Sequence, residues 1–174
     1  MTIPSATRSI LKQRLWDIAD QLGWNNLGQA DKARYYEVWT RDPVIGGVIS
    51  RYMDGGQVRV YIKDTLLKDY GRVRMADPGP PLRSLGIDGQ VASVEKYIKP
   101  HGRRLDDGRV LCWGRADDWK AILMAVHERA FYSDGEPFAA VFMSSCGKYH
   151  DAHSRAVVMD AAKKLGIERI VWLG

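Results

Sequence analysis

The chain has 174 residues, of which 45% are hydrophobic and 27% are charged, a composition typical of a folded globular protein rather than a disordered one. Its apolar runs are far shorter than the ~20 residues that a membrane-spanning helix needs, and its first residues show no secretory signal. Two cysteines, Cys112 and Cys146, are too few for a disulfide framework. We therefore expect a cytoplasmic protein without a membrane segment.

The formal net charge is +5 and is unevenly distributed. Residues 1–75 carry 12 Lys/Arg against 8 Asp/Glu, whereas the remaining residues carry 14 against 13. A basic excess attracts polyanions through long-range steering and counterion release. This balance favours a nucleic-acid partner, DNA more than RNA, and it leaves a homodimer open.

The N-terminal region is predicted to form two helices, over residues 8–23 and 29–40. The first has an apolar stripe at helical spacing, and Gly23 is a natural C′ residue. The second ends at Asp42-Pro43. The stripe consists of Leu11, Leu15, Ile18, Ala19 and Leu22.

After residue 43 the hydrophobic pattern changes from helical spacing to one typical of strands. Residues 45–52 and 57–63 are short runs rich in β-branched residues, and the turn signal Met53-Asp54-Gly55-Gly56 lies between them. The sequence therefore predicts a β-hairpin. After two helices, such a hairpin allows a winged helix-turn-helix in which Lys32 and Arg34 contact DNA. The other interpretation is a helical hairpin packed on a sheet.

Residues 75–90 are rich in Pro and Gly and are expected to form a loop, which is also a candidate sub-boundary. A strand is predicted over residues 91–98. Asp106-Asp107-Gly108 is a second hairpin turn, followed by a strand over residues 110–113.

The last third predicts a helix over residues 117–131 and, in the continuous apolar run 138–143, a strand buried on both faces. A helix over residues 153–165 and a strand over 169–173 complete a βαβ unit. The expected fold class is α/β or mixed α+β, with an N-terminal helix pair, a central β-meander and a C-terminal βαβ unit in a single compact domain.

The run from residue 96 to residue 104 is strongly basic. It contains Lys96, Lys99, Arg103, Arg104 and His101, without an acid. Such a turn can hold phosphates through charge and backbone N–H groups. The alternative is a solvated edge that its charges protect from aggregation.

The element order resembles the αβββαβ arrangement of many metal-dependent nucleases, in which an acid and a lysine at i and i+2 share a strand face. That signature is missing here, because Lys63-Asp64 and Glu95-Lys96 are adjacent pairs. A degenerate site would use Asp54, Asp64 and Glu95 as acids, with Lys63 and Lys96 as its lysines. Asp64 and Glu95 would then hold Mg²⁺.

The loop over residues 144–154 follows the buried strand, where ligands bind in open α/β sheets. Its Cys146, His150 and His153 suggest metal ligation, a nucleophile pair or anion binding. Alternatively, Cys146 is a buried apolar residue and Asp151 or Ser154 caps the helix.

The leading hypothesis is a nucleic-acid-binding protein, leaning towards a phosphodiester hydrolase in the form of a small Mg²⁺-dependent DNA endonuclease. One alternative is an α/β enzyme that binds a nucleotide or small molecule in the 144–154 loop. Another is a non-catalytic protein-interaction module. Trp24, Trp39 and Trp113 are candidates for stacking on bases, or else core and interface anchors.

Overall fold

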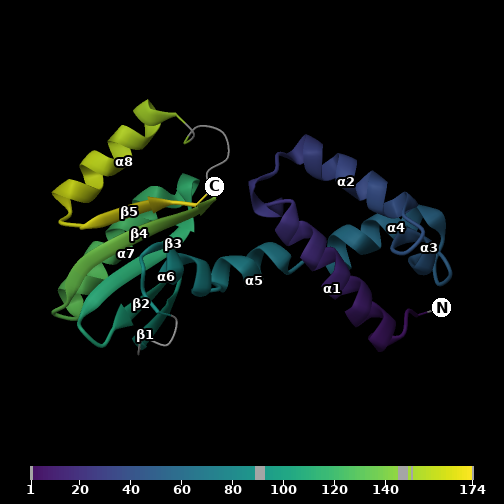
Figure 1. Ribbon diagram of the computed structural model, residues 1–174, viewed down its shortest axis with the longest axis horizontal. Coiled ribbons are helices and arrows are strands. Elements are labelled where there is room, and N and C mark those ends of the chain that lie inside the picture. Colours follow the sequence, from purple (N-terminus) through teal and green to yellow (C-terminus); the bar gives the residue numbers. More distant parts are fainter. Residues whose placement is uncertain (1, 89–92, 145–148, 150, 174) are drawn as a thin grey trace. The chain divides into compact units, whose positions relative to one another are not determined.

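The computed structural model describes residues 2–88, 93–144, 149 and 151–173. The chain forms two compact units, Met1–Arg74 and Met75–Gly174 (Figure 1). The predicted combination of helices with a central sheet is confirmed, since the first unit is helical and the second contains a five-stranded sheet. Among the described helices, none has the length and apolar character required to cross a bilayer.

The helical unit begins with two long helices separated by Gly23, whose left-handed backbone (φ 60°) ends the first of them, as predicted. Short helices follow. The elements are α1 (Ser5–Gln21), η1 (Trp24–Asn26), α2 (Gln29–Arg41), α3 (Gly46–Ile49), α4 (Gly55–Tyr61), η2 (Ile62–Leu66) and α5 (Tyr70–Ala76), whose last two residues are already counted in the second unit.

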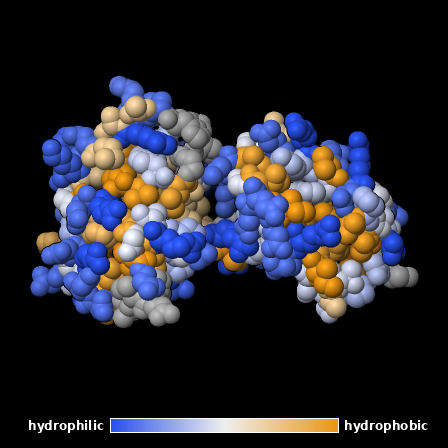
Figure 2. Space-filling model, viewed as in Figure 1, coloured by the Kyte–Doolittle hydropathy of each residue, from blue (hydrophilic) through white to orange (hydrophobic). Residues whose placement is uncertain are grey.

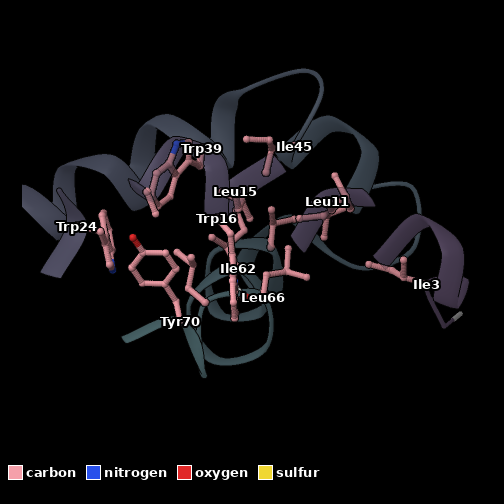
Figure 3. Packing of buried hydrophobic residues seen from close by; sticks show 14 residues of the cluster. Ile3, Leu11, Leu15, Trp16, Trp24, Trp39, Ile45, Ile62, Leu66 and Tyr70 are labelled. Atoms are coloured by element: carbon pink, nitrogen blue, oxygen red, sulfur yellow. Dashed lines mark hydrogen bonds between the residues drawn. The ribbon is translucent and has the colours of Figure 1, made fainter. Parts of the chain in front are cut away.

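The core of this unit is built from aliphatic and aromatic side chains that all of its longer helices contribute (Figure 3). Leu15, Ile49 and Ile62 are fully buried. The Trp16 indole N–H donates to the Leu66 carbonyl at 2.9 Å, which ties α1 to η2. This bond satisfies the one polar group of the indole inside an apolar core.

The prediction of a β-hairpin over residues 45–63 is wrong, because this region is helical. α4 leads into η2, a π-helix. Val58, Ile62 and Leu66 are four residues apart and all buried, whereas Val60 is 56% exposed. The buried stripe therefore follows a helical period, and the alternation of apolar and polar residues in 58–63 is coincidental.

The second unit holds the sheet, in the strand order β1-β2-β3-β4-β5. β1 to β3 are antiparallel, while β4 and β5 run parallel to β3. The elements are α6 (Gly79–Ser84), β1 (Ser93–Ile98), β2 (His101–Leu105), β3 (Arg109–Arg115), η3 (Ala116–Asp118), α7 (Trp119–Tyr132), β4 (Glu136–Ser144), α8 (Ala152–Lys164) and β5 (Arg169–Trp172).

Helices cover both faces of this sheet. Cys112 and Phe142 pack with α7 and α8 on one face, named here the α7 face. Leu111 and Trp113 pack with Leu82 of α6 on the other, named the α6 face. Strands β3 and β4 are consequently buried on both sides, as the continuous apolar run of β4 predicted.

Most predictions for this unit are confirmed. The turn at Asp106-Asp107-Gly108 joins β2 to β3, and β4, α8 and β5 form the predicted βαβ unit. The expectation of a plain loop over 75–90 is wrong in its middle, where the short helix α6 carries buried Leu82. Prolines occupy the first turn of α6, where no backbone N–H is needed for the helix. Met75, the first residue of this unit, also begins the stretch in which the sequence allowed a sub-boundary.

Candidate nucleic-acid interface

The basic run lies on the hairpin formed by edge strand β1 and strand β2. In the register of this pair, Lys96 lies opposite Arg103, and Glu95 lies opposite Arg104. Side chains alternate between the two faces of a sheet. Lys96 and Arg103 therefore point to the α6 face, and Glu95 and Arg104 to the α7 face.

On the α6 face this arrangement brings like charges together. Lys96 and Arg103 are direct cross-strand neighbours, and Lys99 lies in the turn between the strands. Within the described residues, none of these three has an acidic side chain within 4 Å. Like charges directly opposite each other destabilise a strand pair, and an anion bound at this face would offset that repulsion.

The positive charges of this face also affect the protonation of His101. Its imidazole stacks on the Trp113 ring, with centroids 6.2 Å apart and planes at 21°. Burial lowers the pKa of His101, and the charges of Arg103 and Lys96 lower it further. The ring is therefore neutral at pH 7. Burial likewise lowers the pKa of Arg103, whose guanidinium lies 5.4 Å from the Trp113 ring centroid.

Arg129 of α7 anchors the hairpin from the other face. Its guanidinium donates to the backbone carbonyls of Lys99 and Pro100, both at 2.9 Å, and to the Cys112 sulfur at 3.1 Å. It also lies 4.2 Å from the centroid of the Tyr97 ring. The two bonds to the Lys99 and Pro100 carbonyls fix the turn, so that Lys99 is presented from a defined position.

Arg104 was grouped with the phosphate-binding residues, but the structure separates it from them. It lies on the α7 face opposite Glu95, and its Nε is buried without a hydrogen-bond partner among the described residues. Three of the four predicted cations therefore share a surface, and Arg104 does not belong to it.

A cavity of about 420 Å³ opens beside the hairpin turn, at the carboxyl end of β3; we name it the β3 cavity. In a sheet with parallel strands, this end is where ligands bind. Lys99 and His101 line it from the hairpin, and Arg115 and Asp118 from the end of β3 and the start of α7. The remaining lining consists of Met75, Ile98, Pro100, Trp113, Gly114, Ala121 and Ile122.

The predicted nuclease residues are not assembled on one strand meander. Asp54 precedes α4, Lys63 and Asp64 lie in the π-helix η2, and these three residues belong to the helical unit. Glu95 and Lys96 lie on β1 of the other unit and point to opposite faces. The strand placement that suggested Asp64 and Glu95 as joint Mg²⁺ ligands is therefore wrong.

The αβββαβ order itself is present in the second unit, as α6, β1, β2, β3, α7 and β4. Strands β1, β2 and β3, all within the described ranges, lack an acid followed two residues later by a lysine. In the same described ranges, no three His, Cys, Asp or Glu residues are grouped as metal ligands would be.

The residues proposed for a winged helix are placed differently from that interpretation. Lys32 and Arg34 lie on α2, and the Lys32 ammonium is 5.7 Å from the centroid of the Trp24 ring. The hairpin that would have formed the wing is helical. A winged helix-turn-helix is therefore excluded, while a contact of Lys32 and Arg34 with nucleic acid stays a prediction.

The loop over residues 144–154 is described in part. Cys146 and His150 lie outside the described residues, and His153 is an exposed residue of α8. The Asp151 carboxylate accepts a hydrogen bond from the Ser154 backbone N–H at 2.8 Å, which confirms the helix-cap interpretation for Asp151. A ligand role for this loop stays a prediction.

The tryptophans singled out by the sequence are core residues. Trp24, Trp39 and Trp113 are 6%, 4% and 0% exposed. Trp24 packs against Trp39 with centroids 4.9 Å apart, and the Trp113 indole N–H donates to the Met75 carbonyl at 2.8 Å. In this structure their rings are core anchors and are not open platforms for bases.

Sequence reasoning missed Arg115 and Asp118, which line the β3 cavity, and Arg129, which anchors the hairpin from the other face. Asp118 directly precedes α7, and a carboxylate at the start of a helix is expected for the helix dipole alone, so it gave no separate signal of a site. Arg129 carried no local signal, because its partners lie about 30 residues away in the chain.

Comparison with protein families, curated proteins and solved structures finds no match for this chain.

Proposed function

We propose that this protein binds nucleic acid, and that its β1–β2 hairpin holds the phosphate backbone. The observation that carries the proposal is the direct opposition of Lys96 and Arg103 on one face, with Lys99 in the adjoining turn and no acid paired to them in the described structure. A polyanion would remove their mutual repulsion and release counterions. The free, buried Cys112 thiol suits the cytoplasm.

Phosphodiester cleavage is the second candidate, favoured by the αβββαβ order of α6 to β4. Binding alone is the simpler function, since β1 to β3 lack the acid–lysine pair. Mg²⁺ dependence is part of the cleavage proposal. One experiment measures both binding and cleavage: the protein is incubated with single-stranded and duplex DNA, with and without Mg²⁺.

The test of binding is the double variant Lys96→Ala/Arg103→Ala, measured by fluorescence anisotropy with labelled DNA over a range of salt concentrations. Loss of two phosphate contacts should reduce the slope of log K against log salt by about 1.4 for single strands, and weaken binding at low salt by about 10- to 100-fold. Thermal unfolding checks that the hairpin still folds.

Lys163→Ala/Lys164→Ala is the matched control, because it removes two positive charges from the last turn of α8, outside the hairpin. We expect it to bind nearly as well as the wild-type protein. If both double variants weaken binding equally, the effect is one of net charge and the assignment to the hairpin is wrong. If the wild-type protein shows no salt-dependent binding to DNA, the proposed function is wrong.

A further inference from the structure

We infer that the β3 cavity receives the base of one unpaired nucleotide, so that the preferred ligand is single-stranded rather than duplex nucleic acid. This inference rests on the proposed function and gives it a substrate class. It is carried by the position, the lining and the rim charges of the cavity.

The size and lining of the cavity suit a flat heteroaromatic ring. Its volume of about 420 Å³ falls at the small end of the range found for ligand pockets. Met75, Ile98, Pro100, Ala121 and Ile122 make most of its wall apolar, with few polar groups. A base removed from its stack is held in such a pocket between aromatic or apolar side chains.

The rim charges complement the phosphates on either side of such a base. Lys99 and Arg115 both line the cavity, and Lys96 and Arg103 continue the positive surface along the hairpin. His101 is also in the lining, and its imidazole, one face of which stacks on Trp113, is a flat ring of the kind on which a base can stack. Base and backbone would thus be held by adjoining parts of one surface.

Asp118 gives the cavity a preference among bases. Asp118 is a lining residue whose side chain makes no cap hydrogen bond to α7, and within the described residues the ion pair of Arg115 is with Asp117, at 3.5 Å, and not with Asp118. A carboxylate accepts hydrogen bonds from the exocyclic amino group of cytosine. Thymine lacks that group. We therefore expect oligo-dC to bind more tightly than oligo-dT.

A duplex would bind less well, because its bases are paired and stacked. Placing one of them in the cavity requires that it be unpaired and unstacked first. The backbone contacts of the hairpin are available to both forms. Single strands should therefore gain affinity from the cavity, and duplexes should not.

The test fills the cavity and leaves the charges unchanged. Ala121 is exposed on the first turn of α7 and lines the cavity, so Ala121→Leu should occupy the space of a base. Ala156→Leu is the matched control, because the same substitution is made at an exposed position of α8 outside the lining. The probes are a labelled dC 8-mer and an abasic 8-mer with the same phosphates.

We expect Ala121→Leu to weaken binding of the dC 8-mer about tenfold, the effect of losing one stacked base. Binding of the abasic 8-mer should be unchanged, and Ala156→Leu should behave as the wild-type protein. If Ala121→Leu leaves dC binding intact, or weakens both probes equally, the cavity does not hold a base.

Two further readouts keep this result separate from failure of the proposed function and from misfolding. A wild-type protein that binds neither probe would overturn the function itself, whereas binding of both probes with equal affinity would overturn only the cavity inference. Asp118→Ala adds no bulk and should abolish the preference for dC over dT. Persistence of that preference would also contradict the inference.

Discussion

At the scale of single residues, one carboxylate holds the end of the helical unit together. Asp20 of α1 accepts hydrogen bonds from the Tyr70 hydroxyl at 2.7 Å and from two nitrogens of Arg74, at 2.8 and 2.6 Å. The Arg74 guanidinium also lies 5.2 Å from the centroid of the Trp16 ring. Three charge-assisted bonds to one side chain fix α5 against α1.

We predict that Asp20→Asn lowers the free energy of unfolding by about 1–2 kcal/mol. The loss is smaller than for a fully buried network, because Asp20 is partly exposed and solvent screens its charge. Urea unfolding followed by tryptophan fluorescence measures it. Asp17→Asn is the control on the same helix, where the carboxylate accepts from the Gln13 side chain at an exposed position. Equal effects of the two substitutions would show that the Asp20 network adds no stability.

At the scale of elements, residues 45–63 show where sequence reasoning fails. The Gly55-Gly56 pair suggested a hairpin turn, yet both glycines begin α4 with ordinary helical backbone. The stripe of Val58, Ile62 and Leu66 carried the correct period but crosses from α4 into a π-helix. A short alternating run could not distinguish the two structures, because either one buries Val58 and Ile62.

Gly56→Ala distinguishes the helix from the hairpin. A Cβ at Gly56 would meet open space, so alanine should stabilise α4 by about 0.4–1 kcal/mol. In a tight hairpin turn, the same glycine would need positive φ and alanine would be destabilising. Gly23→Ala is the control, since Gly23 has φ of 60° and alanine there is strained. A loss of stability in both variants would contradict a helical α4.

The sheet unit was more predictable, and for a physical reason. The continuous apolar run of β4 and the Asp106-Asp107-Gly108 turn are local signals, and they do not depend on which other elements pack against them. The candidate site was predictable only as a run of charges. Which cations share a face depends on the register of Lys96 with Arg103, and the β3 cavity joins residues from Met75 to Ile122 that only the folded sheet brings together.

At the scale of the whole molecule, ionised carboxylates stabilise both units by accepting hydrogen bonds. The pKa of Asp20 is raised by burial but lowered more by its bonds to Arg74 and Tyr70. The backbone N–H of Arg109 lowers the pKa of Asp107, and that of Ser154 lowers the pKa of Asp151. In each case the folded state favours the charged form.

Acid should therefore destabilise the protein. A carboxyl group whose pKa is lower in the folded state adds stability that is fully present above its unfolded pKa, near 4, and is lost as the pH falls through the folded value. The lowered pKa of His101 acts in the same direction below about pH 6.5, because the unfolded chain takes up that proton first. We expect the urea midpoint to fall slightly from pH 7 to 5.5 and steeply below pH 4. His101→Gln should reduce the first decrease, and Asp20→Asn the second. A midpoint that stays constant from pH 7 to 3 would show that these groups ionise alike in the folded and unfolded states.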